Sequence, residues 1–144
     1  MKKRTLFTLS GACSASASTT LVGNSILGLD DFDWFQVSAT LIGPTGGTVD
    51  VYLQRKIDTG VWQDWVHFPQ MSAGTTKRYV LSAQSTDDIT EVGGGNDATP
   101  GVALSANTNL GGHPCMGVRM VTVTGSGVSV AATQTIYINA FRDA

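Results

Sequence analysis

The sequence predicts an all-β protein, a single antiparallel β-sandwich of about eight strands that we expect to be a jelly roll. Apolar and polar residues alternate along most of the chain, which is the period of a strand with one buried face. Glycine, proline and serine separate the alternating segments and supply turns. Helical periodicity is nearly absent, and residues 27–33 could form one helical turn at most.

The chain has 144 residues, a length typical of one domain that buries a core without help from disulfides. We therefore expect one domain over residues 1–144, with a short basic arm at about 1–10 and a long irregular loop at about 84–114. Charged residues make up only 14% of the chain, against about 25% in an ordinary soluble domain. Such a surface is either covered by neighbouring molecules or rich in strand-edge and turn residues.

The first residues imitate a signal peptide, because a basic start precedes an apolar stretch. A signal peptide has about 7–15 apolar residues in a row. Here that stretch is interrupted by Thr5, Thr8 and Ser10. We therefore expect a first strand with a basic start.

Two alternating segments follow in the first half of the chain. Residues 34–42 and 48–56 are joined by Gly43-Pro44-Thr45-Gly46-Gly47, so we interpret 34–56 as a β-hairpin. A short aromatic strand at 61–68 ends at Pro69.

The second half begins with a strand at 77–83 and then becomes irregular. Residues 84–114 are too long for an ordinary connection, which indicates a functional segment or one ordered against a neighbour, with a brief strand at 102–104. Clear alternation returns at 116–124 and 128–142. In the last strand, one face carries aliphatic residues and the other carries Tyr137 and Phe141, so the strand is either central or in contact with a partner.

The charge pattern argues against nucleic acid as a partner. The net charge is −2, and the nine Lys and Arg residues are scattered apart from those at 2–4, whereas phosphate binding needs a clustered basic face. No segment approaches the roughly 20 apolar residues of a membrane-spanning helix. Cys13 and Cys115 are too far apart for a CxxC motif; they form a disulfide or, as we favour, two buried thiols.

Few residue clusters indicate chemistry. Asp30, Asp31 and Asp33 could hold calcium but lack the glycine and distal glutamate of an EF-hand, so turn capping or solvation is the simpler interpretation. Asp87, Asp88 and Glu91 could bind calcium or a basic patch on a neighbour, but a solvated loop is the simpler interpretation. His67 and His113 are too few for a three-histidine metal site, and we expect His67 to be packed or hydrogen-bonded.

No catalytic motif is evident. The sequence contains no GxSxG, and neither histidine has a serine partner in a recognisable motif, so we expect no enzymatic activity and no cofactor. Trp62 and Trp65 lie three residues apart and should point to opposite faces of their strand. One of them is then in the core, and the other lies in an interface or stacks on a sugar.

The segment 37–54 (VSATLIGPTGGTVDVYLQ), followed by 62–70 (WQDWVHFPQ), resembles small β-sandwich proteins of tailed-bacteriophage virions. The resemblance covers about residues 32–70 and, loosely, the final strand at 128–142. It implies a virion structural protein that is made in the host cytoplasm and sits on the capsid surface. Proteins of this kind are often trimeric capsid decoration proteins.

The sequence-based hypothesis is therefore a decoration (cement) protein that bridges capsomers. Its expected partner is the major capsid protein or another virion protein, and its expected oligomeric state is a homotrimer. Lys2, Lys3, Arg4, Trp62, Tyr137 and Phe141 are the candidate interface residues. The alternative is a carbohydrate-binding module for host adsorption on a phage head or tail fibre. A small hydrolase, with two acidic catalytic residues, is a third and weaker hypothesis.

Overall fold

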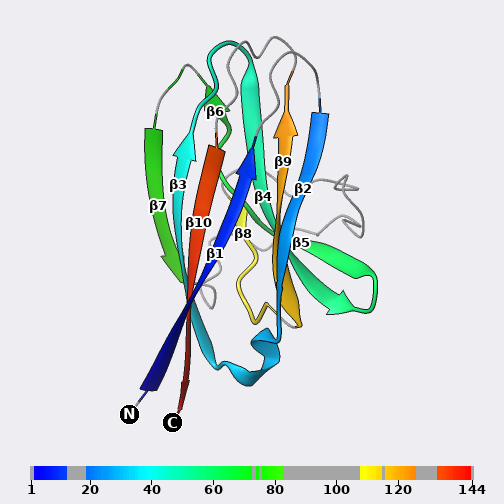
Figure 1. Cartoon of the computed structure of the whole chain (residues 1–144), viewed down its shortest axis with the longest axis vertical. Helices are drawn as coiled ribbons and strands as arrows, with labels where there is room; N and C mark the ends of the chain where they lie inside the picture. The colour runs from blue at the N-terminus through cyan, green and yellow to red at the C-terminus, as the bar shows by residue number, and fades with distance from the viewer. Residues whose placement is uncertain are drawn as a thin grey trace.

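The computed structural model describes residues 2–12, 19–72, 74, 76–82, 108–114, 116–125 and 133–143. These residues form two antiparallel sheets that pack against each other (Figure 1). The described elements are β1 (Lys2–Ala12), β2 (Thr19–Leu27), η1 (Leu29–Asp31), β3 (Trp34–Ile42), β4 (Thr48–Asp58), β5 (Val61–His67), β6 (Met71–Ser72), β7 (Thr76–Ser82), β8 (Thr108–Asn109), β9 (Gly117–Thr124) and β10 (Thr133–Asp143).

The order of the strands is that of a jelly roll, which confirms the fold predicted from the sequence. Sheet A has the order β1-β10-β3-β7, and sheet B has the order β2-β9-β4-β5-β8 with β6 beside β4. With the two-residue strands β6 and β8 set aside, the described chain passes to the other sheet after every strand except β4. Two sheets of four long strands connected in this way form a double Greek key.

The core lies between the two sheets and follows the alternation of the strands. In β3, every second residue is buried, and β10 shows the same pattern over most of its length. In β4, the alternation covers residues 48–51, and residues 52–54 are buried on both faces. The side chains that meet in the core include Phe35, Val37, Leu41, Val49, Val51, Leu53, Trp65, Met120, Ile136 and Ile138. Each sheet therefore has one face in the core and one outer face.

The predicted β-hairpin at 34–56 is wrong, because β3 belongs to sheet A and β4 to sheet B. Residues 43–47 form a corner that carries the chain across the core. Both strands do have one apolar face, but these faces meet across the core instead of lying side by side in one sheet. Gly43 allows the corner to pack directly on β6, since a Cβ there would lie 2.4 Å from the carbonyl oxygen of Ser72.

Most of the other predicted elements are confirmed. Strands lie at the predicted places near 61–68, 77–83 and 116–124, and η1 is the single helical turn expected within 27–33. The strand predicted at 128–142 is confirmed from Thr133 onward, and residues 128–132 lie outside the described residues. β2 was not predicted. The brief strand at 102–104 and most of the irregular loop at 84–114 lie outside the described residues.

The basic N-terminal segment is a strand and not a free extension. β1 pairs with β10 from Lys2 opposite Asp143 to Ala12 opposite Thr133. The two chain ends therefore lie side by side at one end of the molecule (Figure 1). Contact of this segment with a partner stays a prediction. In the described part of the chain, no helix is long and apolar enough to cross a membrane.

Candidate functional site

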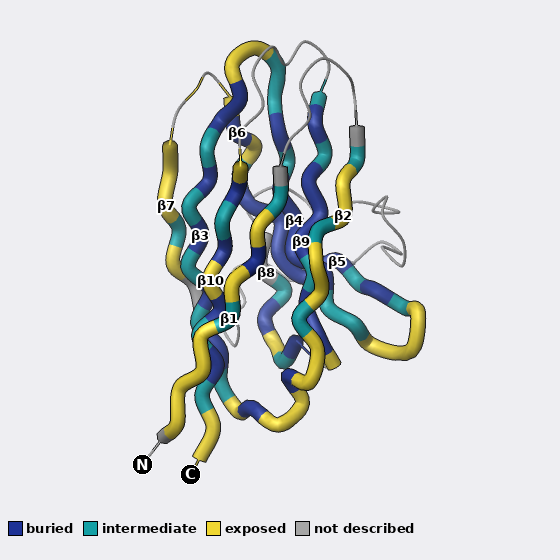
Figure 2. Tube along the Cα trace, viewed as in Figure 1, coloured by how far each residue is buried: buried dark blue, intermediate teal, exposed yellow. Residues whose placement is uncertain are grey.

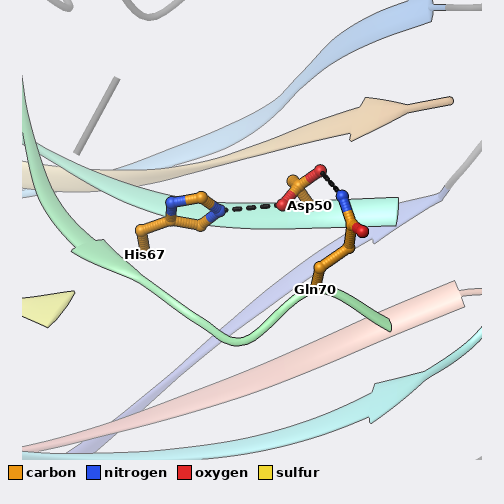
Figure 3. Close-up of polar contacts among 3 residues, drawn as sticks. All are labelled: Asp50, His67 and Gln70. Atoms are coloured by element: carbon orange, nitrogen blue, oxygen red, sulfur yellow. Dashed lines mark hydrogen bonds and ion pairs between the residues drawn. The ribbon is translucent and has the colours of Figure 1, made fainter. Parts of the chain in front are cut away.

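A polar cluster occupies the outer face of sheet B, where alternate residues of β4 and β5 point away from the core. His67 Nε2 lies 2.9 Å from Asp50 Oδ1, and Gln70 Nε2 donates to Asp50 Oδ2 at 2.8 Å (Figure 3). Because a carboxylate only accepts hydrogen bonds, His67 carries a proton on Nε2 and donates it. The His67 ring also stacks on Tyr52, with ring centroids 3.9 Å apart.

Two groups in this cluster titrate away from their ordinary range. The hydrogen bond from His67 lowers the pKa of Asp50, and burial opposes this effect only in part. Burial, together with the negative charges of Asp50 and Asp64, raises the pKa of Tyr52 to about 12. Asp50 is thus held ionised and Tyr52 neutral.

A second group of polar side chains continues the outer face of sheet B. Gln54 Nε2 donates to Asp64 Oδ1 at 2.8 Å, and Arg119 Nε donates to Gln54 Oε1 at 2.9 Å. Gln54 and Asp64 are fully buried. The Arg119 guanidinium lies over the Trp62 ring, 4.4 Å from its centroid. These contacts join β4, β5 and β9 and anchor their side chains in one arrangement.

The geometry of the sheet B cluster favours a structural role. His67 is packed and hydrogen-bonded, as the sequence predicted. Within the described ranges, no group of three or more His, Cys, Asp or Glu residues could hold a metal ion. Asp30 and Asp31 belong to η1, while Asp33 Oδ2 accepts a hydrogen bond from the Asp143 backbone N–H at 3.3 Å.

The outer face of sheet A is different, because it is exposed and has an apolar centre. Tyr137 in β10 is 39% exposed and lies opposite Ser38 of β3, which in turn lies opposite Val80 of β7, 66% exposed. Leu6 of β1, 51% exposed, lies diagonally beside Tyr137 on the same face. Figure 2 shows exposed stretches along β1 and β7 at the two sides of this sheet.

Hydroxyl and amide side chains fill the space between these apolar residues. Gln36 and Asn139 are opposite each other, as are Thr40 and Thr135. At one end of the face, Trp34 and Phe141 pack together with their ring centroids 4.7 Å apart. Among the described outward-facing side chains, cations are confined to opposite ends of the face, at Arg4 and Arg78. We call this surface, from Leu6 and Tyr137 to Val80, the sheet A platform.

The structure brings together only part of the predicted interface set. Arg4 and Phe141 are paired residues on the outer face of sheet A, and Tyr137 lies further along β10 on the same face. The backbones of Lys2 and Lys3 pair with Asp143 and Arg142 near the chain ends. Trp62 lies on the other sheet, so it cannot belong to the same surface.

Trp62 is also less accessible than an interface or sugar-binding residue should be. The prediction that Trp62 and Trp65 point to opposite faces is confirmed, because Trp65 is in the core and Trp62 is on the outer face of sheet B. Trp62 is nevertheless only 9% exposed. Arg119 covers its ring, and the Lys56 amine lies 6.0 Å from its centroid.

Sequence reasoning missed Leu6, Val80 and Trp34 as members of the platform. The strands that carry these residues were predicted, but alternation does not show which strands share a sheet, and so which outward-facing residues share a surface. A partial signal was present, since Leu6 and Val80 alternate with the inward-facing Phe7 and Tyr79. Cys13, Cys115 and the acidic group at 87–91 lie outside the described residues.

Comparison with known proteins gives no match, either to a protein-family model, to a curated protein or to a solved structure. The resemblance to phage virion proteins therefore rests on the sequence patterns at 32–70 and 128–142. The proposal that follows rests on that resemblance, together with the fold and the surface chemistry.

Proposed function

We propose that the protein is a structural protein of a tailed-phage virion, a capsid decoration protein that binds the expanded shell through the sheet A platform. The observation that carries the proposal is the exposure of Leu6, Tyr137 and Val80 across a face whose described centre holds no charge. Exposed apolar patches on a folded domain are typical of protein–protein contact surfaces. The sequence resemblance is the basis for placing the protein on a virion and for naming the major capsid protein as its partner.

The platform suits attachment to a large, repeated surface. It is built on strands of a single sheet, so its backbone is held in place before binding and loses little freedom on contact. Hydroxyl and amide groups between the apolar residues provide hydrogen bonds at intervals along it. One copy binds with modest affinity, and a bridge between two capsomers multiplies that affinity through effective concentration.

The carbohydrate-binding alternative has weaker support among the tryptophans. Trp65 is fully buried, Arg119 covers Trp62, and the half-buried Trp34 packs its ring against Phe141, whereas stacking on a sugar requires an open aromatic face. Tyr137 is the partly exposed aromatic residue at the centre of the platform. A test of this alternative should therefore compare glycan binding by the wild type and by Tyr137 variants, in addition to measuring quenching of tryptophan fluorescence.

The experiment that tests the proposal is co-sedimentation of the purified protein with expanded capsids that lack it. We expect saturable binding and a rise in the temperature at which the capsids rupture. Val80→Glu should weaken binding at least tenfold, because it places a charge in the contact. Ile57→Glu is the matched control, since Ile57 is 45% exposed at the end of β4 in sheet B. Wild-type protein that does not bind these capsids would overturn the proposal.

A further inference from the structure

The edges of the two sheets are not equally protected against pairing with another chain. In the described part of the chain, β1 and β7 are the edges of sheet A, and β2 and β8 are the edges of sheet B. Proteins protect open edges with charges, bulges or very short strands. β7 exposes Lys77 and Arg78, β2 has a register shift between Val22 and Ser25, and β8 has two residues.

β1 lacks these protections over most of its length. It has 11 residues and pairs with β10 without a register shift, so its other side is a long regular edge. The cations are confined to residues 2–4, and residues 5–12 carry no charge and no proline. Side chains at 3–6, 8 and 10 are exposed. An edge of this kind is a template for an added strand.

Exposed apolar side chains gather on the same side of the sandwich. β1 and β2 are the edge strands of their sheets on this side, and they lie next to each other across the core (Figure 1). Leu6 is 51% exposed, Leu21 is 37% exposed and Val22 is 41% exposed. Between the two strands is a hollow of about 240 Å³. Its lining comprises Ser10, Gly11, Leu21, Val22, Gly23, Asn24, Met120 and Thr122.

We propose that two copies of this chain associate about a twofold axis by antiparallel pairing of their β1 strands, centred on Phe7. The inference rests on the edge of β1, which pairs with no further strand in the described part of the chain, and not on the proposed function. Pairing over the whole strand places Arg4 of one copy opposite Ser10 of the other, and Lys3 opposite Gly11. The two four-stranded A sheets then become one continuous sheet of eight strands.

The charges select this arrangement over the alternatives. Antiparallel pairing puts each cation opposite an uncharged residue, whereas parallel pairing would put the cations of the two copies directly opposite one another, which is unfavourable. Near the axis, Leu6 of one copy lies opposite Thr8 of the other. A trimer, as expected from the sequence, would need a different contact.

The hollow provides a place for one of these cations. Residues directly opposite in an antiparallel pair point to the same face of the sheet. Gly11 faces the interior, since a Cβ there would lie 2.9 Å from Met120 Cε. Lys3 of the second copy therefore points toward the hollow beside Gly11. Its aliphatic stem can lie along Met120 while its amine stays at the mouth of the hollow.

The test is sedimentation equilibrium of the free protein, without capsids, over a wide concentration range. We expect a monomer–dimer equilibrium. Ser10→Arg places two like-charged pairs in each dimer and should weaken dimerisation roughly two- to thirtyfold, whereas Ser10→Glu should strengthen it by a similar factor. Ser10 is exposed, so both variants should fold, which circular dichroism checks.

The matched controls are Thr59→Arg and Thr59→Glu, which make the same charge changes at an exposed turn between β4 and β5. They should leave the dimer unchanged. A protein that remains monomeric up to about millimolar concentration overturns the inference, as does a trimer. A dimer that responds equally to the Ser10 and Thr59 changes also overturns it. Because capsids are absent, none of these outcomes bears on the proposed binding to the shell.

Discussion

Replacing Gly43 with alanine tests the corner that carries the chain from sheet A to sheet B. A Cβ at this position would lie 2.4, 2.9 and 3.0 Å from the carbonyl oxygen, carbonyl carbon and amide nitrogen of Ser72. Backbone atoms cannot rotate away as a side chain can, so either the corner or β6 must move by several tenths of an ångström. β6 is held by its pairing with β4 at Thr48 and Val49.

The expected cost follows from overpacking in a region that cannot relax freely. Such substitutions destabilise proteins by about 1–3 kcal/mol. For a domain of this size, this corresponds to a fall in Tm of about 3–12 °C, at roughly 3–4 °C per kcal/mol. Thermal unfolding followed by far-UV circular dichroism measures it, with urea unfolding as a second reading of the free energy.

Gly60→Ala is the control, because Gly60 has a φ of +71° and nothing within 4 Å of its Cβ position. It should cost only the conformational strain of alanine in the left-handed region, about 1–2 kcal/mol. Gly43 does not adopt a positive φ, so its penalty must be steric. A Gly43→Ala variant as stable as the wild type would refute the packing of this corner on β6.

Two further predictions concern hydrogen-bonded polar groups, one in the sheet B cluster and one in the core. Asp50→Asn should remove part of the acid sensitivity of folding. The pKa of Asp50 is lowered in the folded protein, because Asp50 accepts a hydrogen bond from His67. The stabilisation from this bond is therefore present above pH 4 and is lost as the pH falls through the lowered pKa. Urea unfolding between pH 2 and 6 should show a smaller loss of unfolding free energy on acidification in the variant than in the wild type. An equal dependence of this free energy on pH in both proteins would contradict the role given to Asp50. Trp65→Phe should cost about 1–3 kcal/mol, because Trp65 Nε1 donates to the Gly111 carbonyl at 3.0 Å inside the core; a change below about 0.5 kcal/mol in urea unfolding would contradict it.

The fold class could be predicted from the sequence because the alternation of apolar and polar residues indicates which face of a strand is buried. Phe35 and Val37 in β3 and Val49 and Val51 in β4 are examples. Alternation says nothing about which strand lies beside which, so β3 and β4 were interpreted as neighbours. β2 was missed because its register shift between Val22 and Ser25 interrupts the two-residue period.

The candidate site was only partly predictable for the same reason. Tyr137 and Phe141 could be assigned to the outer face of the last strand from the sequence alone. Trp62 could not be recognised as covered, because Arg119 reaches it from β9, far along the chain. Val80 joins Tyr137 on the platform only because β3 lies between their strands.

The most direct test of the central claim is a density map of expanded capsids reassembled with the purified protein. The account predicts that each bound copy turns the sheet A platform toward the shell, with Leu6, Tyr137 and Val80 in the contact. The outer face of sheet B, with Asp50 and His67, should lie away from the shell. Copies bound with sheet B against the shell, or capsids without any bound copy, would contradict the account.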